Sequence, residues 1–186
     1  NETGCLLIMD EIQTGMGRTG DLWAFEEENV IPDILLLAKG FGGGLPLGAF
    51  ISSEKNMHAL ADEPPLGHMT TFGGNALCCA ASLEALNIIT EDKLFLNAKK
   101  QGHVIKSCLS GHVAVKAVRG RGLMMAIELH DAFQLKPAIK ACREQGLLVD
   151  WFLFNDRSIR MAPPLILTDT ETQSICEKFI EALDSL

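Results

Sequence analysis

Two ionisable side chains stand directly after short apolar runs of the chain. Asp10 follows the run Cys5–Met9, and Lys39 follows the run Ile34–Ala38. Short continuous apolar runs bounded by polar residues are typical of strands buried in a sheet. In open α/β sheets, ligands bind beyond the carboxyl ends of the strands. We therefore expect the Asp10 and Lys39 side chains to face one crevice, although they lie far apart in the sequence.

A carboxylate and a lysine in one crevice suit the chemistry of pyridoxal 5′-phosphate (PLP). The lysine amine forms a Schiff base with the aldehyde of this cofactor. The carboxylate keeps the pyridine nitrogen protonated, so that the ring can accept electrons from a carbanion. The same residues could instead form an ordinary buried ion pair, or Lys39 could simply be solvated. Taken alone, Asp10 and Lys39 favour this simpler interpretation.

The elements that would position the two residues follow from the apolar pattern. Besides the two apolar runs, we expect a third strand at Leu47–Ser52 and a short helix or loop within Asp21–Asn29. The glycines of Gly40–Gly44 predict a flexible turn whose backbone passes close to another group. Residues 54–75 are expected to be loop-rich, because prolines and glycines recur there.

From Ala76 onward the pattern predicts helices in alternation with short strands. Apolar spacing indicates helices from Ala76, over Glu91–Leu109 and from Leu135, and the last helix follows a capping box of Thr168 and Glu171. The expected strands are Val113–Val118, Leu123–Leu129, Leu147–Val149 and Ser158–Met161.

These elements predict an α/β fold in two pieces. Residues 1–75 would form part of a larger sheet that lacks its other strands, because three strands are too few for a stable doubly wound sheet. Residues 76–105 would form linking helices, and residues 106–186 a small C-terminal α/β domain.

The composition limits the classes of function. The chain has 186 residues, of which 47% are hydrophobic and 22% charged, and its net charge is -8 at pH 7. That charge argues against a nucleic-acid binder, which needs a basic face. The charge suits a soluble cytoplasmic enzyme, and it would suit many other functions as well. No apolar run approaches the ~20 residues that span a bilayer, and no secretory signal is visible. Because the chain begins at Asn1 rather than Met, we expect it to be cut from something longer.

The cysteines and histidines give little support to a metal site. The five histidines show no HxxxH or HExxH spacing, and the cysteines contain no CxxC pair. Reduced and buried thiols are therefore expected for the six cysteines. These are Cys5, Cys78, Cys79, Cys108, Cys142 and Cys176.

Longer motifs around Asp10 and Lys39 resemble a known family. The stretches Leu6–Gly20 and Pro32–Ala49 are similar to the signature of class III (omega-amino) aminotransferases, which are fold-type I PLP enzymes. The match continues in order through Thr70–Asn75, Val118–Leu123 and Ile159–Leu165, and covers nearly the whole chain. It is most similar to the ornithine and acetylornithine branch. The resemblance implies a mixed sheet and makes residues 1–75 the C-terminal part of a large PLP-binding domain.

The resemblance also implies a role for five residues. Lys39 matches the Schiff-base lysine, which shuttles a proton between the substrate carbon and the cofactor C4′ atom. Asp10 matches the partner of the pyridinium nitrogen, and Gln13 matches the residue that hydrogen-bonds the phenolic oxygen of the ring. Thr71 matches the residue that reaches the cofactor phosphate of the neighbouring subunit in a homodimer. Arg160 matches the arginine that binds a substrate α-carboxylate, a bidentate task that suits its planar guanidinium.

Three of these residues have simpler alternatives. Gln13 could be a polar residue at a strand end, and Thr71 could be a hydroxyl in a helix N-cap region. Arg160 could pair with a nearby acid. Structural roles are expected for three further arginines that match family positions, namely Arg18, Arg119 and Arg121.

The activity implied by the resemblance is transfer of an amino group from an ornithine- or acetylornithine-like amino acid or amine to a 2-oxo acid such as 2-oxoglutarate. The alternatives are a PLP aminomutase or decarboxylase of the same fold, or a non-catalytic dimerisation fragment. The family's phosphate-binding turn, the aromatic residue that stacks on the ring and most substrate-selecting residues lie upstream of this chain. We therefore expect the chain to be inactive alone. Ala76 stands where relatives have proline, a change that should be harmless.

Overall fold

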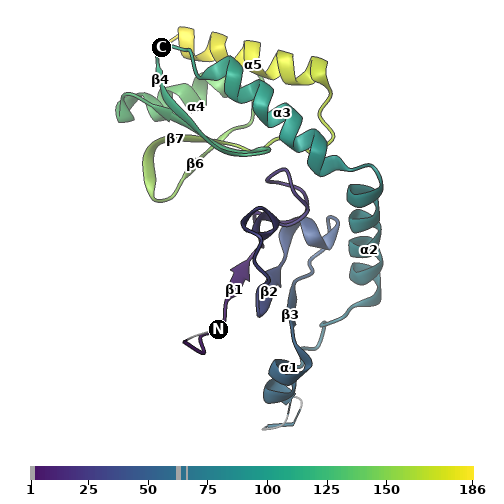
Figure 1. Ribbon diagram of the computed structural model, residues 1–186. Helices are drawn as coiled ribbons and strands as arrows, with labels where there is room; N and C mark the ends of the chain where they lie inside the picture. Colours follow the sequence, from purple (N-terminus) through teal and green to yellow (C-terminus); the bar gives the residue numbers. More distant parts are fainter. Residues whose placement is uncertain (1–2, 62–63, 66) are drawn as a thin grey trace. The chain divides into compact units, whose positions relative to one another are not determined.

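The fold is mixed α/β, as expected, and it divides into two units. The computed structural model describes residues 3–61, 64–65 and 67–186. Unit 1 comprises the residues up to Met16 together with Asp21–Lys93, and unit 2 comprises Gly17–Gly20 together with Leu94–Leu186. Unit 1 contains a three-stranded sheet and unit 2 a four-stranded sheet (Figure 1).

The sheet of unit 1 is mixed, as the resemblance implies. Its strands are β1 (Ile8–Asp10), β2 (Ile34–Leu37) and β3 (Ala49–Ser52), in the order β1-β2-β3. β1 runs parallel to β2, and β3 runs antiparallel to it. Two 3-10 helices, η1 (Ala24–Glu28) and η2 (Lys39–Gly42), precede and follow β2 in the sequence. Lys39 therefore lies two residues after the end of the central strand, β2.

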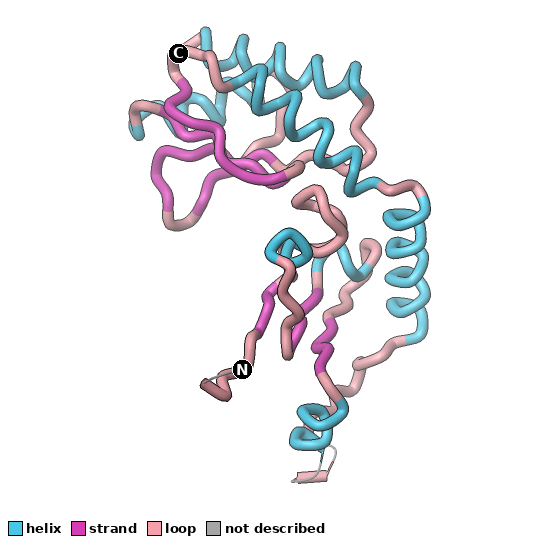
Figure 2. The backbone as a smooth tube through the Cα atoms, viewed as in Figure 1, coloured by secondary structure: helices cyan, strands magenta, loops and turns pink. Residues whose placement is uncertain are grey.

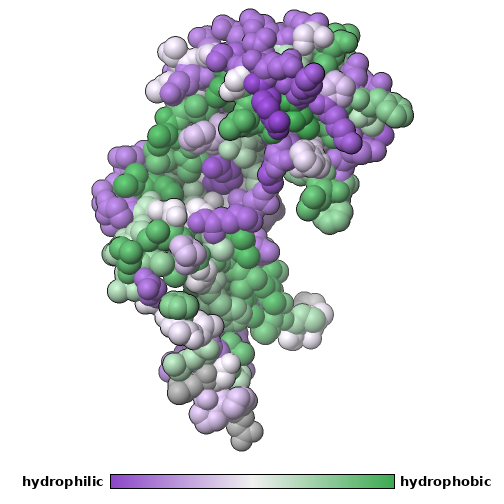
Figure 3. Space-filling view, turned by 180° about the vertical axis from the view of Figure 1, so that it is seen from behind, coloured by the Kyte–Doolittle hydropathy of each residue, from purple (hydrophilic) through white to green (hydrophobic). Residues whose placement is uncertain are grey.

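The first strand is shorter and more exposed than the sequence predicts. The expectation of a buried strand over Cys5–Met9 is wrong, because the ladder begins only at Ile8. Leu6, Leu7 and Ile8 are 55%, 40% and 53% exposed. β1 lies at the edge of the described sheet and has β2 as its neighbour there, so its other edge is uncovered. Hydrophobic residues are accordingly prominent on the visible surface of unit 1 (Figure 3).

The glycine-rich turn after β2 packs closely against a helix. Gly43 has a left-handed backbone with φ 60, and a Cβ there would overlap the carbonyl group of Ala81. Ala81 belongs to helix α2 (Ala76–Glu91). The close approach expected for Gly40–Gly44 is therefore to α2, and glycine supplies both the backbone conformation and the missing side chain.

Helix α1 (Glu54–Ala61) lies in a region that the sequence predicts as loop. Its residues, EKNMHALA, include no glycine or proline and are mostly good helix formers. The prolines and glycines that suggested a loop follow the helix, so the expectation is wrong for this first part of residues 54–75. Residues 62, 63 and 66 of that stretch lie outside the described residues.

The sheet of unit 2 is antiparallel throughout. Its strands are β4 (Val115–Arg121), β5 (Met124–Leu129), β6 (Asp150–Phe152) and β7 (Asn155–Met161), in the order β4-β5-β7-β6. The strand expected at Leu147–Val149 is wrong, because pairing with β7 begins only at Asp150. Likewise, the strand expected at Val113–Val118 is observed at Val115–Arg121, so only a tight link around Gly122 separates β4 from β5.

Helices cover one face of this sheet (Figure 2). They are α3 (Leu94–Leu109), α4 (Leu135–Glu144), with the 3-10 turn η3 (Ala132–Gln134) before it, and α5 (Asp169–Asp184). The predicted capping box of Thr168 and Glu171 is confirmed at the start of α5. Strand and helix side chains form a common core, whose fully buried members include Ile105, Leu109, Ile127, Leu129, Ile159 and Phe179.

The cysteines differ in burial more than the sequence predicts. Cys142 and Cys176 are buried in unit 2, where burial raises the pKa of the Cys142 thiol to about 11 and that of Cys176 to about 12. Cys5, Cys79 and Cys108 are exposed, so the expectation of buried thiols is wrong for these three. Among the described residues, no helix has the length and apolar character needed to cross a membrane.

Candidate active site

Asp10 and Lys39 lie at the same edge of the unit 1 sheet. The parallel register places Asp10 opposite Leu36, and the backbone N–H of Glu11 donates to the carbonyl of Leu36 at 3.0 Å. β2 ends one residue later, at Leu37, and Lys39 opens η2. Because parallel strands direct their carboxyl ends to one edge, the fold brings the predicted acid and the predicted lysine together there.

Lys39 has an unusual backbone conformation for a residue with a side chain. Its φ is 52, in the left-handed region that glycine normally occupies. The turn is fixed around it, because the N–H of Phe41 donates to the carbonyl of Ala38 at 3.1 Å. The Lys39 side chain is exposed at the end of the central strand. Such conformations cluster at active sites, but Lys93 has a similar one. The position of Lys39 at the carboxyl edge of the sheet is therefore the more specific feature.

The carboxylate of Asp10 is oriented by its own backbone. The N–H of Ile12 donates to Asp10 Oδ1 at 3.0 Å. This bond turns the carboxylate toward the loop that follows β1 and leaves it a second oxygen for a ligand. Asp10 is exposed in the described structure, so a ring nitrogen could reach it from the carboxyl edge.

Glu11, which the sequence analysis did not single out, holds the turn that carries Gln13. Its side chain is only 5% exposed. One carboxylate oxygen accepts the hydroxyl of Thr14 at 2.5 Å, and the other accepts the N–H of Phe25 at 2.9 Å. The Glu11 carbonyl also accepts the N–H of Gly15 at 3.0 Å. Its place beside Asp10 at the end of an apolar run was the available signal, but its partners depend on the folded turn.

Gln13 and Thr71 are exposed turn residues of unit 1. β1 ends at Asp10, so Gln13 lies in the following turn, and the alternative of a strand-end residue is wrong. The alternative of an N-cap hydroxyl is also wrong for Thr71. Asn75 caps α2, since its side chain accepts the N–H groups of Leu77 and Cys78 at 3.1 and 3.2 Å. Both side chains therefore stay available for the contacts that the family resemblance implies.

Arg160 lies in unit 2, on the face of the sheet opposite the helices. It pairs in register with Ala126 of β5 and with Asp150 of β6, and paired residues project to the same side. Ala126 is followed by the fully buried Ile127, which faces the helical core. The Arg160 guanidinium donates to the Asp150 carboxylate, with the two side chains 35% and 49% exposed. The acid pairing that the sequence left as an alternative is therefore present.

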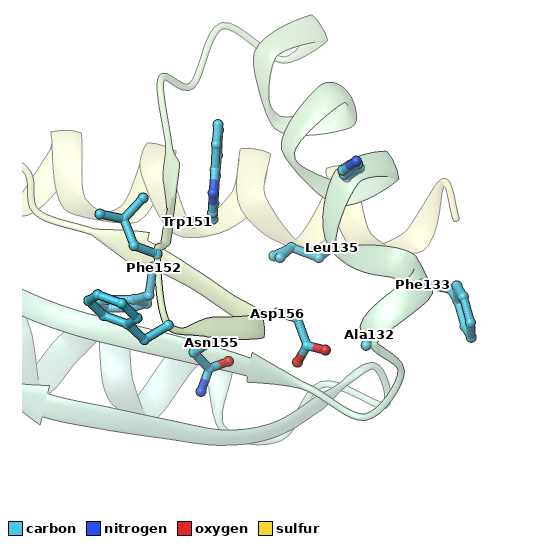
Figure 4. Close-up of a pocket in the computed structure, with 10 residues that line it drawn as sticks. Ala132, Phe133, Leu135, Trp151, Phe152, Asn155 and Asp156 are labelled. Atoms are coloured by element: carbon cyan, nitrogen blue, oxygen red, sulfur yellow. The ribbon is translucent and has the colours of Figure 1, made fainter.

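An open pocket of about 860 Å³ lies elsewhere in unit 2 (Figure 4). It is bounded by residues 132 and 133 of η3, residues 135 and 136 at the start of α4, and residues 151–156 of the β6–β7 hairpin. Its lining is largely apolar and includes Phe133, Trp151 and Phe154. None of the five predicted site residues lines it, so this pocket is separate from the predicted chemistry.

The functional groups at the carboxyl edge of unit 1 fit PLP. The Asp10 carboxylate suits a protonated ring nitrogen, the Lys39 amine suits an aldehyde, and the Gln13 amide suits a phenolic oxygen. Asp10 and Lys39 follow adjacent parallel strands, and both are exposed at the same edge of the sheet. The arrangement is compatible with PLP binding, although a carboxylate and a lysine at one sheet edge do not by themselves identify a PLP-dependent enzyme.

The comparison with known families agrees. The Aminotransferase class-III profile matches residues 1–183, and the chain belongs to this family. The cofactor of the family is PLP. The sheets and helices described above are accordingly those of fold-type I aminotransferases.

Solved structures of aminotransferases match nearly the whole chain. Ornithine aminotransferase from Toxoplasma gondii is 36% identical, with a TM-score of 0.91, and the match covers 99% of this chain and 44% of that one. PLP partially occupies its active site. Acetylornithine aminotransferase from Elizabethkingia anophelis is 33% identical, with a TM-score of 0.89, over 100% of this chain and 47% of that one.

An (S)-enantioselective omega-transaminase from Thermomicrobium roseum is 32% identical, with a TM-score of 0.89. That match covers 99% of this chain and 44% of the transaminase. The chain therefore spans less than half the length of these solved structures.

Proposed function

We propose that the protein is a PLP-dependent aminotransferase. It transfers an amino group between an ornithine- or acetylornithine-like amino acid or amine and a 2-oxo acid such as 2-oxoglutarate, as a cytoplasmic homodimer. The observation that carries the proposal is the left-handed Lys39 at the carboxyl edge of β2, next to the strand that ends in Asp10. The test is to incubate the full-length protein with PLP, 2-oxoglutarate and ornithine or acetylornithine, and to measure glutamate. Absence of glutamate with every amino donor would reject the proposal.

In this proposal four residues of unit 1 have separate roles at the cofactor. PLP, when bound, supplies an electron sink for the carbanion that deprotonation of the substrate creates. Lys39 would hold the cofactor through its amine and would serve as the acid and base for the proton at the substrate carbon. Asp10 holds the proton on the ring nitrogen. Gln13 orients the ring through its phenolic oxygen, and Thr71 contacts the phosphate bound by the neighbouring subunit.

Arg160 binds the α-carboxylate of the substrate in this proposal. Its guanidinium offers two parallel N–H donors to a carboxylate, and in the structure it uses the Asp150 carboxylate as its partner. The pair is partly exposed, so an incoming carboxylate can replace Asp150 without leaving a buried charge unpaired. Asp150 therefore keeps the arginine oriented until substrate arrives.

Arg160→Lys is expected to raise KM for α-carboxylate substrates by roughly 10- to 100-fold, which corresponds to the loss of one charged hydrogen bond. An ammonium group is a point charge and cannot reproduce the bidentate fork. KM for simple amines, which have no carboxylate, should stay within about twofold of the wild-type value. Steady-state kinetics of the full-length protein with both substrate types measures this. An equal rise for both would make Arg160 a structural residue.

The 186-residue chain alone is expected not to transaminate. Its relatives are about twice as long, and apolar side chains of β1 are uncovered in the described structure. By resemblance, the cofactor phosphate sits on backbone amides at a helix N-terminus upstream of this chain. The assay adds PLP, an amino donor and 2-oxoglutarate to the purified chain, with the full-length protein as control. Turnover of roughly 1 per second or faster would contradict this expectation.

A further inference from the structure

A short segment between two parts of unit 1 is built into unit 2. Gly17–Gly20 belongs to unit 2, although the residues before and after it belong to unit 1. The backbone N–H of Leu123 donates to the carbonyl of Arg18 at 3.0 Å. Gly122 has φ 51, and a Cβ there would overlap the backbone of Arg18 and Thr19. The segment after the Gln13 turn therefore packs tightly against the link between β4 and β5.

The Arg18 side chain lies where the ladder between β5 and β7 ends. The antiparallel register pairs Met125 with Met161, so two residues beyond this pair Leu123 stands opposite Pro163. Proline has no N–H and cannot continue a ladder. Arg18 Nη1 donates instead to the carbonyl of Pro163 at 2.5 Å and to that of Leu123 at 3.3 Å. One guanidinium thus joins the ends of both strands.

The contacts of Arg18 require its particular shape. Burial lowers the pKa of the guanidinium from its ordinary value, yet arginine stays charged in proteins. Hydrogen bonds from a charged donor are stronger than neutral ones. Both hydrogen bonds leave the same nitrogen, Nη1. This nitrogen lies one bond further from the backbone than the ammonium of a lysine would, so a lysine falls short of the two carbonyl groups.

We infer that Arg18 is a positioning residue for Arg160, acting through the backbone at Pro163. The inference rests on the proposed role of Arg160 in binding the substrate carboxylate. Arg160 lies near the end of β7, and Pro163 follows two residues after Met161, the last residue of that strand. A bidentate contact tolerates little misplacement, because both N–H donors must meet their oxygens together. By fixing the exit of β7, Arg18 fixes the direction from which Arg160 projects.

The test is Arg18→Lys in the full-length protein, with steady-state kinetics on an α-amino acid and on a simple amine. KM for the α-amino acid is expected to rise roughly 10-fold, because misplacement of a substrate-positioning group is costly. KM for the simple amine and the visible absorption of the bound cofactor should be unchanged. Arg157→Lys is the matched control, since Arg157 lies on the same strand and pairs with the neighbouring Asp156. It should leave both KM values unchanged. An equal rise for both substrates, or no rise, would overturn the inference.

Hydrogen–deuterium exchange separates this inference from the proposed function. Arg18→Lys should speed amide exchange in residues 159–165 several-fold, and Arg157→Lys should not speed exchange at Met161 and beyond. Unchanged exchange in Arg18→Lys would overturn the inference whether or not the enzyme is active. If Arg18→Lys speeds exchange as expected but the wild-type protein does not transaminate, the proposed function fails and the contact of Arg18 with the end of β7 stands. Faster exchange in an active enzyme with unchanged KM would also overturn the positioning role.

Discussion

Lys39→Ala is expected to remove the visible absorption of the lysine-bound cofactor and to lower turnover by roughly 10³-fold or more. In the proposed function Lys39 supplies both the covalent attachment and the proton transfer, and general acid–base catalysis alone contributes about 10²–10⁴-fold. The measurements are an absorption spectrum of the full-length variant with PLP and its rate with 2-oxoglutarate and an amino donor. A wild-type spectrum and rate would remove Lys39 from the mechanism.

Lys93→Ala is the matched control for this experiment. Lys93 is an exposed lysine of unit 1 and, like Lys39, has a left-handed backbone, with φ 50 against 52. Replacing either side chain therefore changes the cost of that backbone conformation in the same way. The control should keep the absorption band and the rate. Loss of activity in both variants would indicate a backbone effect and not the chemistry of the Lys39 amine.

Asp10→Asn is expected to lower turnover by about 10²–10³-fold while cofactor affinity changes far less. The asparagine oxygen can still accept the N–H of Ile12, which donates to Asp10 Oδ1 at 3.0 Å, so the turn should be retained. The neutral amide cannot hold a proton on the ring nitrogen, and the ring then accepts electrons poorly. Titration with PLP and steady-state kinetics together measure the two effects.

Asp33→Asn controls for the loss of a carboxylate in the same sheet. Asp33 precedes β2, at the opposite end of the strand from Lys39, and its Oδ2 accepts the N–H of Leu7 at 2.8 Å. It should leave turnover near the wild-type value. Near-normal turnover in Asp10→Asn, or an equal loss in Asp33→Asn, would contradict the role of Asp10.

The sequence predicted that Asp10 and Lys39 lie at the same edge of the unit 1 sheet, because the direction of the strands decides where their carboxyl ends lie. Apolar runs locate β1 and β2, and the residues after them occupy the carboxyl ends whatever the details of packing. The capping box at Thr168 and Glu171 was predictable for a similar reason, since both partners lie within one helical turn. Patterns of this kind are predictable because their geometry depends only on residues that are close in the sequence.

The burial of β1 and the position of β6 were not predictable in the same way. An apolar run indicates a strand, but only the arrangement of neighbouring strands decides whether Leu6 and Leu7 are covered. Similarly, Leu147–Val149 has the composition of a strand, whereas the ladder partners of β7 begin at Asp150. Tertiary pairing overrides local propensity at such places.

The polar partners of the site were the least predictable part. Glu11 meets the backbone of Phe25, and Arg18 meets carbonyl groups at Leu123 and Pro163. These contacts join segments that are distant in sequence, and a single sequence contains no pattern that links them. The Asp150 partner of Arg160 depends likewise on the register of β6 against β7.

The most direct test of the central claim is to identify the lysine that forms the covalent bond to the cofactor. The full-length protein is incubated with PLP, reduced with borohydride to make the bond permanent, digested and analysed by mass spectrometry. We expect the pyridoxyl group on Lys39, in the peptide that continues into Gly40–Gly44. Modification of another lysine in its place, such as the exposed Lys55 or Lys93, or a reduced protein without any pyridoxyl group, would contradict the assignment of the site.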